Sequence, residues 1–208
     1  FRSYTLDGSE PTAASPRYTG PVEIGKSARF RATALREGGE NASYSREFAF
    51  SKSTGRPAVL NTKPNDSYTF EGASLLVDGY HSRPVFTSGA WLGYLDEPLD
   101  VTIDMGGDQS YRSVELETLA EKGDWIFPPS SVTVWVSDNG TDFTEVASVT
   151  VPEAKAGDAD GIGRYRMQFP ETSARYLKVV AQNAAAIPAW HPGAGSKGFL
   201  FVDEIVVE

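Results

Sequence analysis

Residues 75–94 bring together side chains that can bind metal ions or small molecules. The apolar run Leu75–Val77 leads into Asp78 and Gly79, a pair typical of a turn. The loop that follows carries an imidazole, a guanidinium and two aromatic groups, from His81, Arg83, Trp91 and Tyr94. Polar and aromatic residues of these types suit a binding surface better than a core. We therefore expect this stretch to organise a binding site.

A second acidic stretch lies near the end of the sequence, at Phe201–Ile205, and contains Asp203 and Glu204. We expect it to meet the Asp78 turn in the folded protein. The alternative is that Asp78 caps its own turn and Glu204 points to solvent from an edge strand. The sequence leaves both open.

The elements that position these residues are predicted to be short β-strands. The 208 residues suffice for two modest domains, and 20 Gly and 13 Pro spread throughout fit many turns. No apolar run approaches the ~20 residues of a membrane-spanning helix, so we expect no membrane span. The absence of Cys excludes disulfides, thiolate metal sites and cysteine nucleophiles.

Charge is divided unevenly along the chain. Residues 1–56 hold nine Lys and Arg and six Asp and Glu, a net charge of +3. Residues 57–208 hold ten and twenty-two, a net charge of −12. An acidic second domain repels phosphate backbones and sulfated polysaccharides. The charge therefore argues against a nucleic acid partner and favours neutral ligands or cations.

The first fifty residues show the period-two pattern of β-strands. Ala28, Phe30 and Ala32 fall on one face of a predicted strand at 28–35, with Arg29 and Arg31 on the other. Similar patterns near both ends of this segment, at 2–7 and 44–50, predict a small antiparallel sheet domain over residues 1–50. The polar segment 51–57 is predicted to be a linker.

The run Tyr4–Thr12, Tyr-Thr-Leu-Asp-Gly-Ser-Glu-Pro-Thr, is followed by Tyr18–Pro21. Together they resemble the immunoglobulin-like module at the C-terminal side of bacterial chitobiase and β-hexosaminidase enzymes. A complete sandwich of this type needs about seven strands, and we expect three or four here. The resemblance implies an incomplete immunoglobulin- or fibronectin-like domain, whose first strands lie outside this sequence.

Residues 58–208 are again predicted to be strands and turns. The best hairpin signal is the alternation Val132, Val134, Val136 followed by an Asn-Gly turn. A short helical turn is expected at 72–78. The predicted strands lie at 58–62, 66–70, 99–104, 111–119, 131–137, 142–149, 163–169, 174–182 and 199–207. This number of strands predicts an all-β jelly-roll sandwich.

Six short segments span this second domain and match, in the same order, the segments of a known family. They lie at 76–79, 91–94, 101–106, 134–143, 174–179 and 201–205. With them the domain resembles the discoidin, or coagulation-factor 5/8 C-type, family, whose carbohydrate-binding members accompany glycoside hydrolase domains. The resemblance implies a discoidin-like, galactose-binding-like jelly roll over residues 58–208.

A structural calcium ion joins the first loop to the last strand in that family. The resemblance implies carboxylate ligands from Asp78 and Glu204, with main-chain carbonyl ligands from Leu75, Tyr80, Arg83 and Asp203. Calcium takes about six to eight oxygen ligands, so the carbonyls would have to complete the site. A catalytic metal is not expected, because the only two His, His81 and His191, lie in different loops.

Carbohydrate sites on sandwiches combine an aromatic surface with side chains that hydrogen-bond to hydroxyls. The predicted loops offer such groups at His81, Arg83, Trp125, Trp190 and His191. Alternatives exist, because a loop His can cap the backbone and Arg83 can pair with a surface carboxylate. Trp91 and Trp135 are expected to be core or loop anchors.

No catalytic residues are predicted, because neither His lies in a recognisable nucleophile motif and the carboxylates are scattered. Two functions remain. One is a non-catalytic accessory region that targets a β-hexosaminidase- or chitobiase-type glycoside hydrolase to neutral glycans containing N-acetylglucosamine or galactose. The other is a structural module that packs against the catalytic domain of the parent enzyme. The resemblance implies a secreted, periplasmic or cell-surface location.

Overall fold

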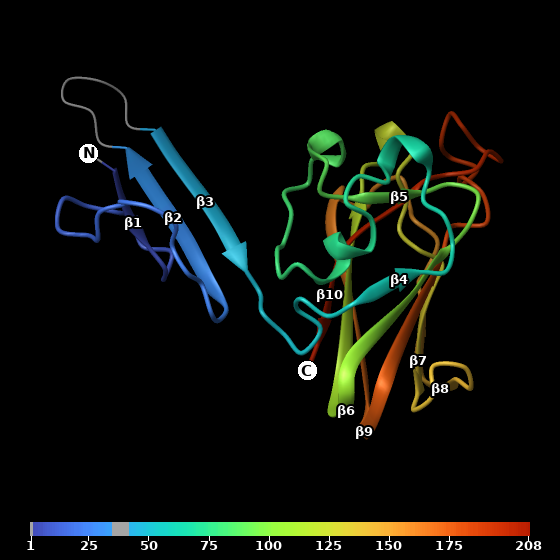
Figure 1. The fold of residues 1–208 in the computed structure, drawn as a ribbon. Coiled ribbons are helices and arrows are strands. Elements are labelled where there is room, and N and C mark those ends of the chain that lie inside the picture. The colour runs from blue at the N-terminus through green and yellow to red at the C-terminus, as the bar shows by residue number, and fades with distance from the viewer. Residues whose placement is uncertain (1, 35–41) are drawn as a thin grey trace. The chain divides into compact units, whose positions relative to one another are not determined.

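The computed structural model describes residues 2–34 and 42–208, which are mostly β-strand and divide into two compact units (Figure 1). Unit 1 extends to Ser51 and also contains Gly79–His81. Unit 2 contains Lys52–Asp78 and Ser82–Glu208. The predicted all-β class is confirmed, and no helix among the described residues has the length and apolar character needed to cross a membrane.

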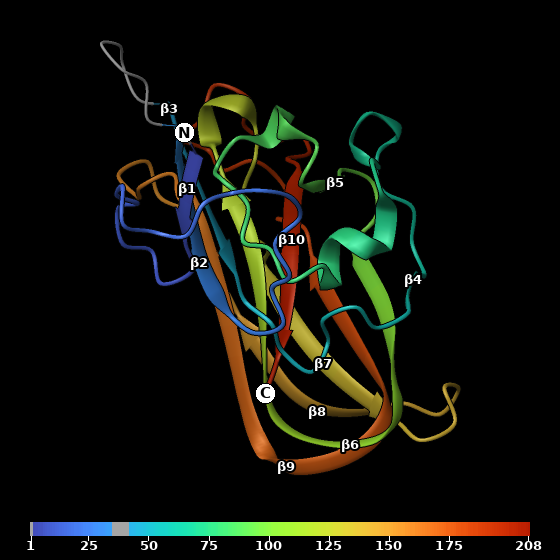
Figure 2. The same ribbon diagram turned by 60° about the vertical axis from the view of Figure 1, so that its left-hand side comes forward.

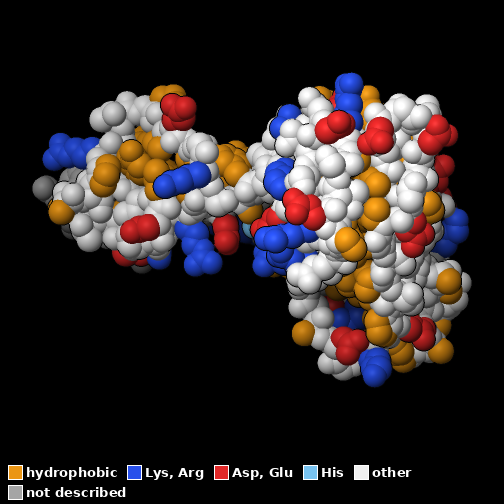
Figure 3. All heavy atoms as spheres, turned by 90° about the horizontal axis from the view of Figure 1, so that it is seen from below, with side chains coloured by type: hydrophobic (Ala, Val, Ile, Leu, Met, Phe, Trp, Pro, Cys, Tyr) orange, Lys and Arg blue, Asp and Glu red, His pale blue; other side chains and the backbone are white. Residues whose placement is uncertain are grey.

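Unit 1 is built on a three-stranded antiparallel sheet in the order β1-β2-β3, with β1 at Arg2–Thr5, β2 at Ala28–Ala34 and β3 at Ala42–Phe48. Residue 35, at the end of the predicted second strand, lies outside the described residues. Figure 3 shows hydrophobic side chains exposed on this unit among scattered charges.

Aromatic rings gather on one face of this sheet. The ring of Phe30 stacks on Tyr4 at 5.8 Å between centroids and meets Tyr44 edge-on at 6.3 Å. Tyr44 is nevertheless 49% exposed. The rings of unit 1 therefore pack mainly on one another.

Unit 2 is a β-sandwich organised by two long strands, β6 (Leu99–Ala120) and β9 (Gly161–Gln182). Residues 99–104 pair with 176–181, whereas 113–120 pair with 161–168, and the register shifts between these two blocks. Gly106, at φ +81°, lies at the shift, where a left-handed residue allows the chain to bend. Figure 2 shows both strands bending, so each one serves both sheets of the sandwich.

The remaining strands extend these two sheets. β4 and β7 flank the first block of paired residues and β8 follows β7, whereas β10 and then β5 flank the second block. Their bounds are β4 Ala58–Leu60, β5 Leu92–Tyr94, β7 Ser131–Ser137, β8 Thr144–Thr150 and β10 Leu200–Val207. Alternate side chains of both sheets form one buried core, which includes Val101, Leu116, Val134, Leu177 and Val202.

Short 3-10 helices occur in the loops, η1 at Asp66–Tyr68, η2 at Gly72–Val77, η3 at Phe86–Ser88 and η4 at Lys122–Asp124. The helical turn expected at 72–78 is confirmed as η2. The predicted strand at 66–70 is wrong, because the Asn65 side chain accepts the Ser67 N–H at 3.1 Å and caps η1 instead. The strand pairs predicted at 99–104 and 111–119, and at 163–169 and 174–182, are the continuous β6 and β9.

The segment expected to be a linker, 51–57, packs within unit 2 from Lys52 onward. The Lys52 N–H donates to the Val207 carbonyl at 3.0 Å, and the buried Ser53 hydroxyl donates to the Ile205 carbonyl at 2.6 Å. These bonds join the segment to β10.

The long loops of unit 2 lie at one end of the sandwich, because the strands that they connect end on the same side (Figure 1). These loops are residues 61–91, 121–130, 151–160 and 183–199. Antiparallel pairing of β6, β7, β8 and β9 requires this, because Leu99 faces Ala181 and Ser131 faces both Thr150 and Gln182. Side chains from these loops can therefore converge.

Candidate functional site

The last strand carries two adjacent buried carboxylates, on Asp203 and Glu204, which are 1% and 0% exposed. Regular strand residues point alternately to opposite faces. Here the register of β10 against β6 shifts between Val202 and Ile205, and such a bulge redirects side chains. The bulge explains how both carboxylates are buried, and it excludes the alternative of a solvent-facing Glu204.

The two acidic stretches meet. The Ser82 N–H donates to Asp203 Oδ2 at 2.8 Å, and η2 packs against β10. Burial, together with the negative charges of Glu117 and Asp78, raises the pKa of Asp203 to about 8, although the hydrogen bond from the Ser82 N–H acts in the opposite direction. We call Asp78, Asp203 and Glu204 the acidic cluster.

Three other residues predicted to bind calcium have defined surroundings. The Leu75 side chain is buried in η2, 5% exposed. The Arg83 carbonyl accepts the indole N–H of Trp91 at 2.9 Å and the Val85 N–H at 2.7 Å, so both of its lone pairs are engaged. Tyr80 groups with unit 1, where its ring packs on Phe48 at 4.9 Å between centroids.

Within residues 2–34 and 42–208, no group of three or more His, Asp or Glu side chains is arranged to hold a metal ion by itself. The donors of the acidic cluster are nevertheless hard oxygens in a buried setting, the type that calcium prefers. The cluster fits a calcium ion only if main-chain carbonyls complete the coordination.

A second buried polar group lies in the loops and depends on Lys122. Its ammonium donates to the Asp158 carbonyl at 2.9 Å and to the Asp160 carboxylate. Its carbonyl accepts the Trp125 N–H at 3.0 Å and faces His191 Nε2 at 2.9 Å. One residue thereby joins loops 121–130, 151–160 and 183–199. We call Lys122, Trp125, Trp190 and His191 the loop cluster.

His191 is a structural member of this cluster. Its Nδ1 accepts the Gly193 N–H at 3.0 Å, which requires the proton to sit on Nε2, where it is donated to the Lys122 carbonyl. The side chain is 9% exposed and both of its nitrogens are engaged. We therefore expect His191 to support the loops rather than bind a hydroxyl.

Trp125 has a fixed backbone and an exposed ring. Its φ is +64°, a left-handed conformation that is unusual for a bulky residue. Its carbonyl accepts the Phe199 N–H at 2.8 Å, and a Cβ added to Gly193 would lie 2.8 Å from the indole, so the ring rests on this glycine. The side chain is 42% exposed.

Trp190 also packs against His191. Its indole N–H donates to the Ala154 carbonyl at 2.9 Å, and its ring packs near Phe127 and His191, at 6.3 and 5.5 Å between centroids. It is 40% exposed. The imidazole of His191 thus lies beside two exposed indole rings, since Trp125 meets it edge-on at 6.1 Å.

Among the other predicted sugar-binding residues, Arg83 is exposed and His81 is half-buried and groups with unit 1. The loop cluster brings together Trp125, Trp190 and His191. Sequence reasoning missed Lys122 and Asp160, because a Lys between Glu121 and Gly123 resembles an ordinary surface charge and its partner is 38 residues away.

A family model decides the identity of the sandwich. The model of the F5/8 type C domain matches residues 61–197, which is more than half of the chain. The chain belongs to the F5/8 type C domain family. The model of the chitobiase/beta-hexosaminidase C-terminal domain matches residues 3–46. Both resemblances expected from the sequence are confirmed.

Several solved structures are similar to this F5/8 type C protein. CpGH89CBM32-5 from Clostridium perfringens, in complex with GalNAc-β-1,3-galactose, is 17% identical, with 73% of this chain and 93% of that chain covered at a TM-score of 0.49. Chitosan-binding module 1 from a chitosanase/glucanase of Paenibacillus sp. IK-5 is 18% identical, with 76% and 98% covered at a TM-score of 0.49. No curated protein sequence matches the chain.

Proposed function

We propose that this F5/8 type C domain is a non-catalytic carbohydrate-binding module for neutral glycans containing N-acetylglucosamine or galactose. The observation that carries the proposal is the pair of exposed indoles in the loop cluster, Trp125 and Trp190. An aromatic face packs on the apolar face of a pyranose, and a ring held in place before binding loses little freedom when the sugar arrives.

The two tryptophans are held by different contacts. The indole N–H of Trp190 is donated to Ala154, so its exposed surface offers mainly the ring. The ring of Trp125 rests on Gly193. Hydrogen bonds to sugar hydroxyls then have to come from other groups, and the exposed Arg83 stays a candidate.

Calorimetric titration with neutral oligosaccharides tests this function. Trp125→Ala and Trp190→Ala are each expected to weaken binding by about tenfold or more, because each removes a stacking surface. Phe70→Ala is the control, since Phe70 is a similarly exposed loop aromatic, 44%, outside the loop cluster. Failure of the unmodified protein to bind any neutral glycan would favour the alternative, a structural module that packs against a catalytic domain.

We further propose that the acidic cluster binds a structural calcium ion, with carboxylate oxygens from Asp78 and Glu204 and main-chain oxygens that include Leu75. Burial raises the pKa of the neighbouring Asp203 carboxyl, and a cation beside it would favour its ionised form. The ion would offset this buried charge and fix the loop that leaves η2.

Thermal melting tests the calcium site. A chelator is expected to lower the melting temperature by several degrees, because an ion that binds the folded state alone stabilises it by mass action. Asp78→Ala should abolish this dependence on calcium. Asp66→Ala, which removes an exposed carboxylate of η1, is the control and should retain it. A melting temperature that is unchanged by both the chelator and Asp78→Ala would contradict the proposed calcium ion.

We also propose that the module accompanies the catalytic domain of a β-N-acetylhexosaminidase of the chitobiase type, outside the cytoplasm. The family match of residues 3–46 supports this association. In the whole enzyme, deleting residues 52–208 should reduce activity on a polymeric substrate and spare activity on a soluble disaccharide, because the module raises the local substrate concentration. Equal losses on both substrates would support the structural alternative.

A further inference from the structure

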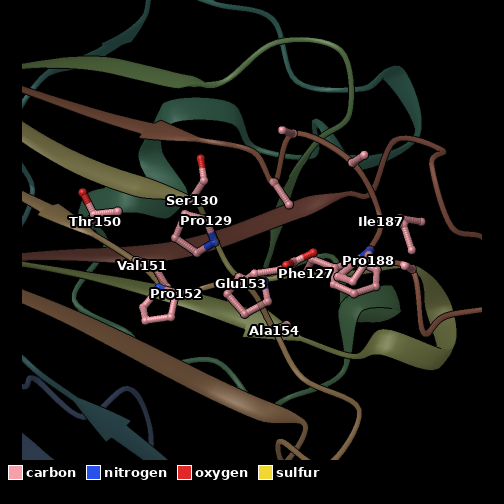
Figure 4. A pocket seen from close by; sticks show the side chains of 15 residues that line it. Phe127, Pro129, Ser130, Thr150, Val151, Pro152, Glu153, Ala154, Ile187 and Pro188 are labelled. Carbon is pink, nitrogen blue, oxygen red and sulfur yellow. The ribbon is translucent and has the colours of Figure 1, made fainter.

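A groove of about 410 Å³ lies beside Trp190, and no role has been assigned to it. Figure 4 shows side chains from three loops around it. They belong to residues 127–130, 150–154 and 184–189. Trp190 directly follows the last of these segments, and its indole N–H is bonded to Ala154 in the groove wall. The volume lies within the range of small-molecule sites, so a sugar that stacks on Trp190 could extend into the groove.

The wall of the groove is apolar and stiff. Its lining includes four prolines, Pro128, Pro129, Pro152 and Pro188, and the methyl groups of Ala154 and of the alanines at 184–186 and 189. Proline has a fixed φ, and Pro129 and Pro188 are buried, so the shape of the groove is set before a ligand arrives.

Few polar groups of this wall are available to a ligand. The Ser130 hydroxyl donates to the Asn183 carbonyl at 2.9 Å, and the Ile187 N–H donates to the Ser196 carbonyl at 2.8 Å. Thr150 and Glu153 are exposed and offer side-chain oxygens, and Glu153 is the one ionisable residue among the described residues that line the groove. The groove thus combines an apolar wall with one anionic acceptor.

This combination selects among neutral sugars. A plain hexose would turn hydroxyls toward methyl groups and proline rings, and a buried hydroxyl without a partner costs free energy. An N-acetylated sugar replaces one hydroxyl by an amide that carries a methyl group, an N–H and a carbonyl oxygen, and the carbonyl oxygen has to stay in contact with water outside the apolar wall. The methyl group suits the wall, the N–H can be donated to an oxygen acceptor, and the negative Glu153 disfavours uronic acids and other anionic sugars.

We propose that the groove is a subsite for the acetamido group of an N-acetylhexosamine, next to the sugar ring that stacks on Trp190. This inference rests on the proposed carbohydrate-binding function and narrows it to N-acetylated glycans. Galactose or glucose units without the acetamido group would use the tryptophan platform alone.

Two oligosaccharides with the same backbone test the subsite, the β-1,4-linked trimers of N-acetylglucosamine and of glucose. Calorimetry on the whole chain should show about tenfold or more preference for the acetylated trimer, the effect of a small apolar group in a fitting pocket. Ala186→Phe places a ring in the groove and should remove this preference, leaving the affinity for the glucose trimer unchanged. Ala156→Phe, an exposed change in loop 151–160 outside the lining, should retain it.

The outcomes separate the subsite from the function on which it rests. Equal affinity for both trimers, or a preference that survives Ala186→Phe in a protein with unchanged melting temperature, overturns the subsite and leaves carbohydrate binding intact. Binding of neither trimer, nor of any other neutral glycan, overturns both. If Ala186→Phe lowers the melting temperature, Ala184→Leu gives a smaller filling of the same groove and should reduce the preference in proportion.

Discussion

The acidic cluster and the loop cluster of unit 2 both contain buried ionisable side chains, and they differ in how the charge of these side chains is balanced. In the loop cluster the ammonium of Lys122 meets the carboxylate of Asp160, and both nitrogens of His191 are hydrogen-bonded. In the acidic cluster Asp203 is desolvated and faces the negative charge of Asp78.

This difference indicates which part of the domain depends on ions in the surrounding solution. A buried charge is tolerated when it is paired, and it is costly otherwise. The loop cluster takes its cation from the chain itself, so the tryptophans are held in the protein alone. In the acidic cluster, burial and the neighbouring charges of Glu117 and Asp78 disfavour the ionised form of Asp203, which a bound cation would stabilise. Sugar binding and calcium binding should therefore be separable.

The largest effect is expected from Lys122→Met, which removes the cation of the loop cluster. Lys122 is 9% exposed and Asp160 48%, so Asp160 keeps some hydration and the loss of folding free energy should be about 2–3 kcal/mol. Urea denaturation measures it. Lys197→Met is the matched control, because its pair with Asp96 is exposed on both sides and should contribute nothing measurable. Similar losses for the two variants would remove the special role of Lys122.

A smaller change in stability is expected from Asp203→Asn, and its sign should depend on whether calcium is present. In a chelator near neutral pH the variant should be more stable than the unmodified protein by about 1–2 kcal/mol, because Asn avoids the cost of protonating a carboxyl whose pKa is raised to about 8 in the folded state. In calcium the same variant should be less stable, because the ion then faces less negative charge. Melting curves in both buffers measure the sign. The same sign in both conditions would contradict the contrast between the clusters.

The smallest effect is expected for the ion pair of Asp104 and Arg175, which lies outside both clusters and is more exposed to solvent. Hydrogen bonds from Arg175 and from the Gly106 N–H lower the pKa of Asp104 to about 2. A lowered pKa gives stability that is present above the ordinary value, near 3.8, and is lost as the pH falls through about 2.

Because Arg175 is 47% exposed, we expect this contribution to be only about 1 kcal/mol. Asp104→Asn should remove this part of the loss of stability between pH 4 and pH 2, as followed by urea denaturation at each pH. An unchanged slope would show that solvent screens the pair completely.

The fold was predictable where the pattern was local. The alternation at 131–137 and the turn at 72–78 are read directly from the residues, and both occur as expected. The continuity of β6 was not predictable, because Gly106 and Gly107 resemble a loop, whereas pairing with β9 on both sides carries the strand through them. Asn65 shows the converse case, since a single cap turned a predicted strand into η1.

The candidate site was predictable by residue type but not by role. Trp190 and His191 are neighbours with similar surroundings in the sequence, yet one presents an exposed ring and the other is enclosed with both nitrogens engaged. That distinction depends on Lys122 and Gly193, which approach only after folding. The bulge at Asp203 was also not predictable, because regular strand alternation would not bury two adjacent carboxylates.

Because β6 and β9 belong to both sheets, the sandwich has no half that can open alone. A slip of one residue between these strands would turn the core side chains of both layers outward together. All the loops that carry the tryptophans begin or end on strands joined to this pair, so their arrangement should vanish in the same cooperative step as the core. Sugar binding and the folded structure are then expected to be lost at one temperature rather than at two.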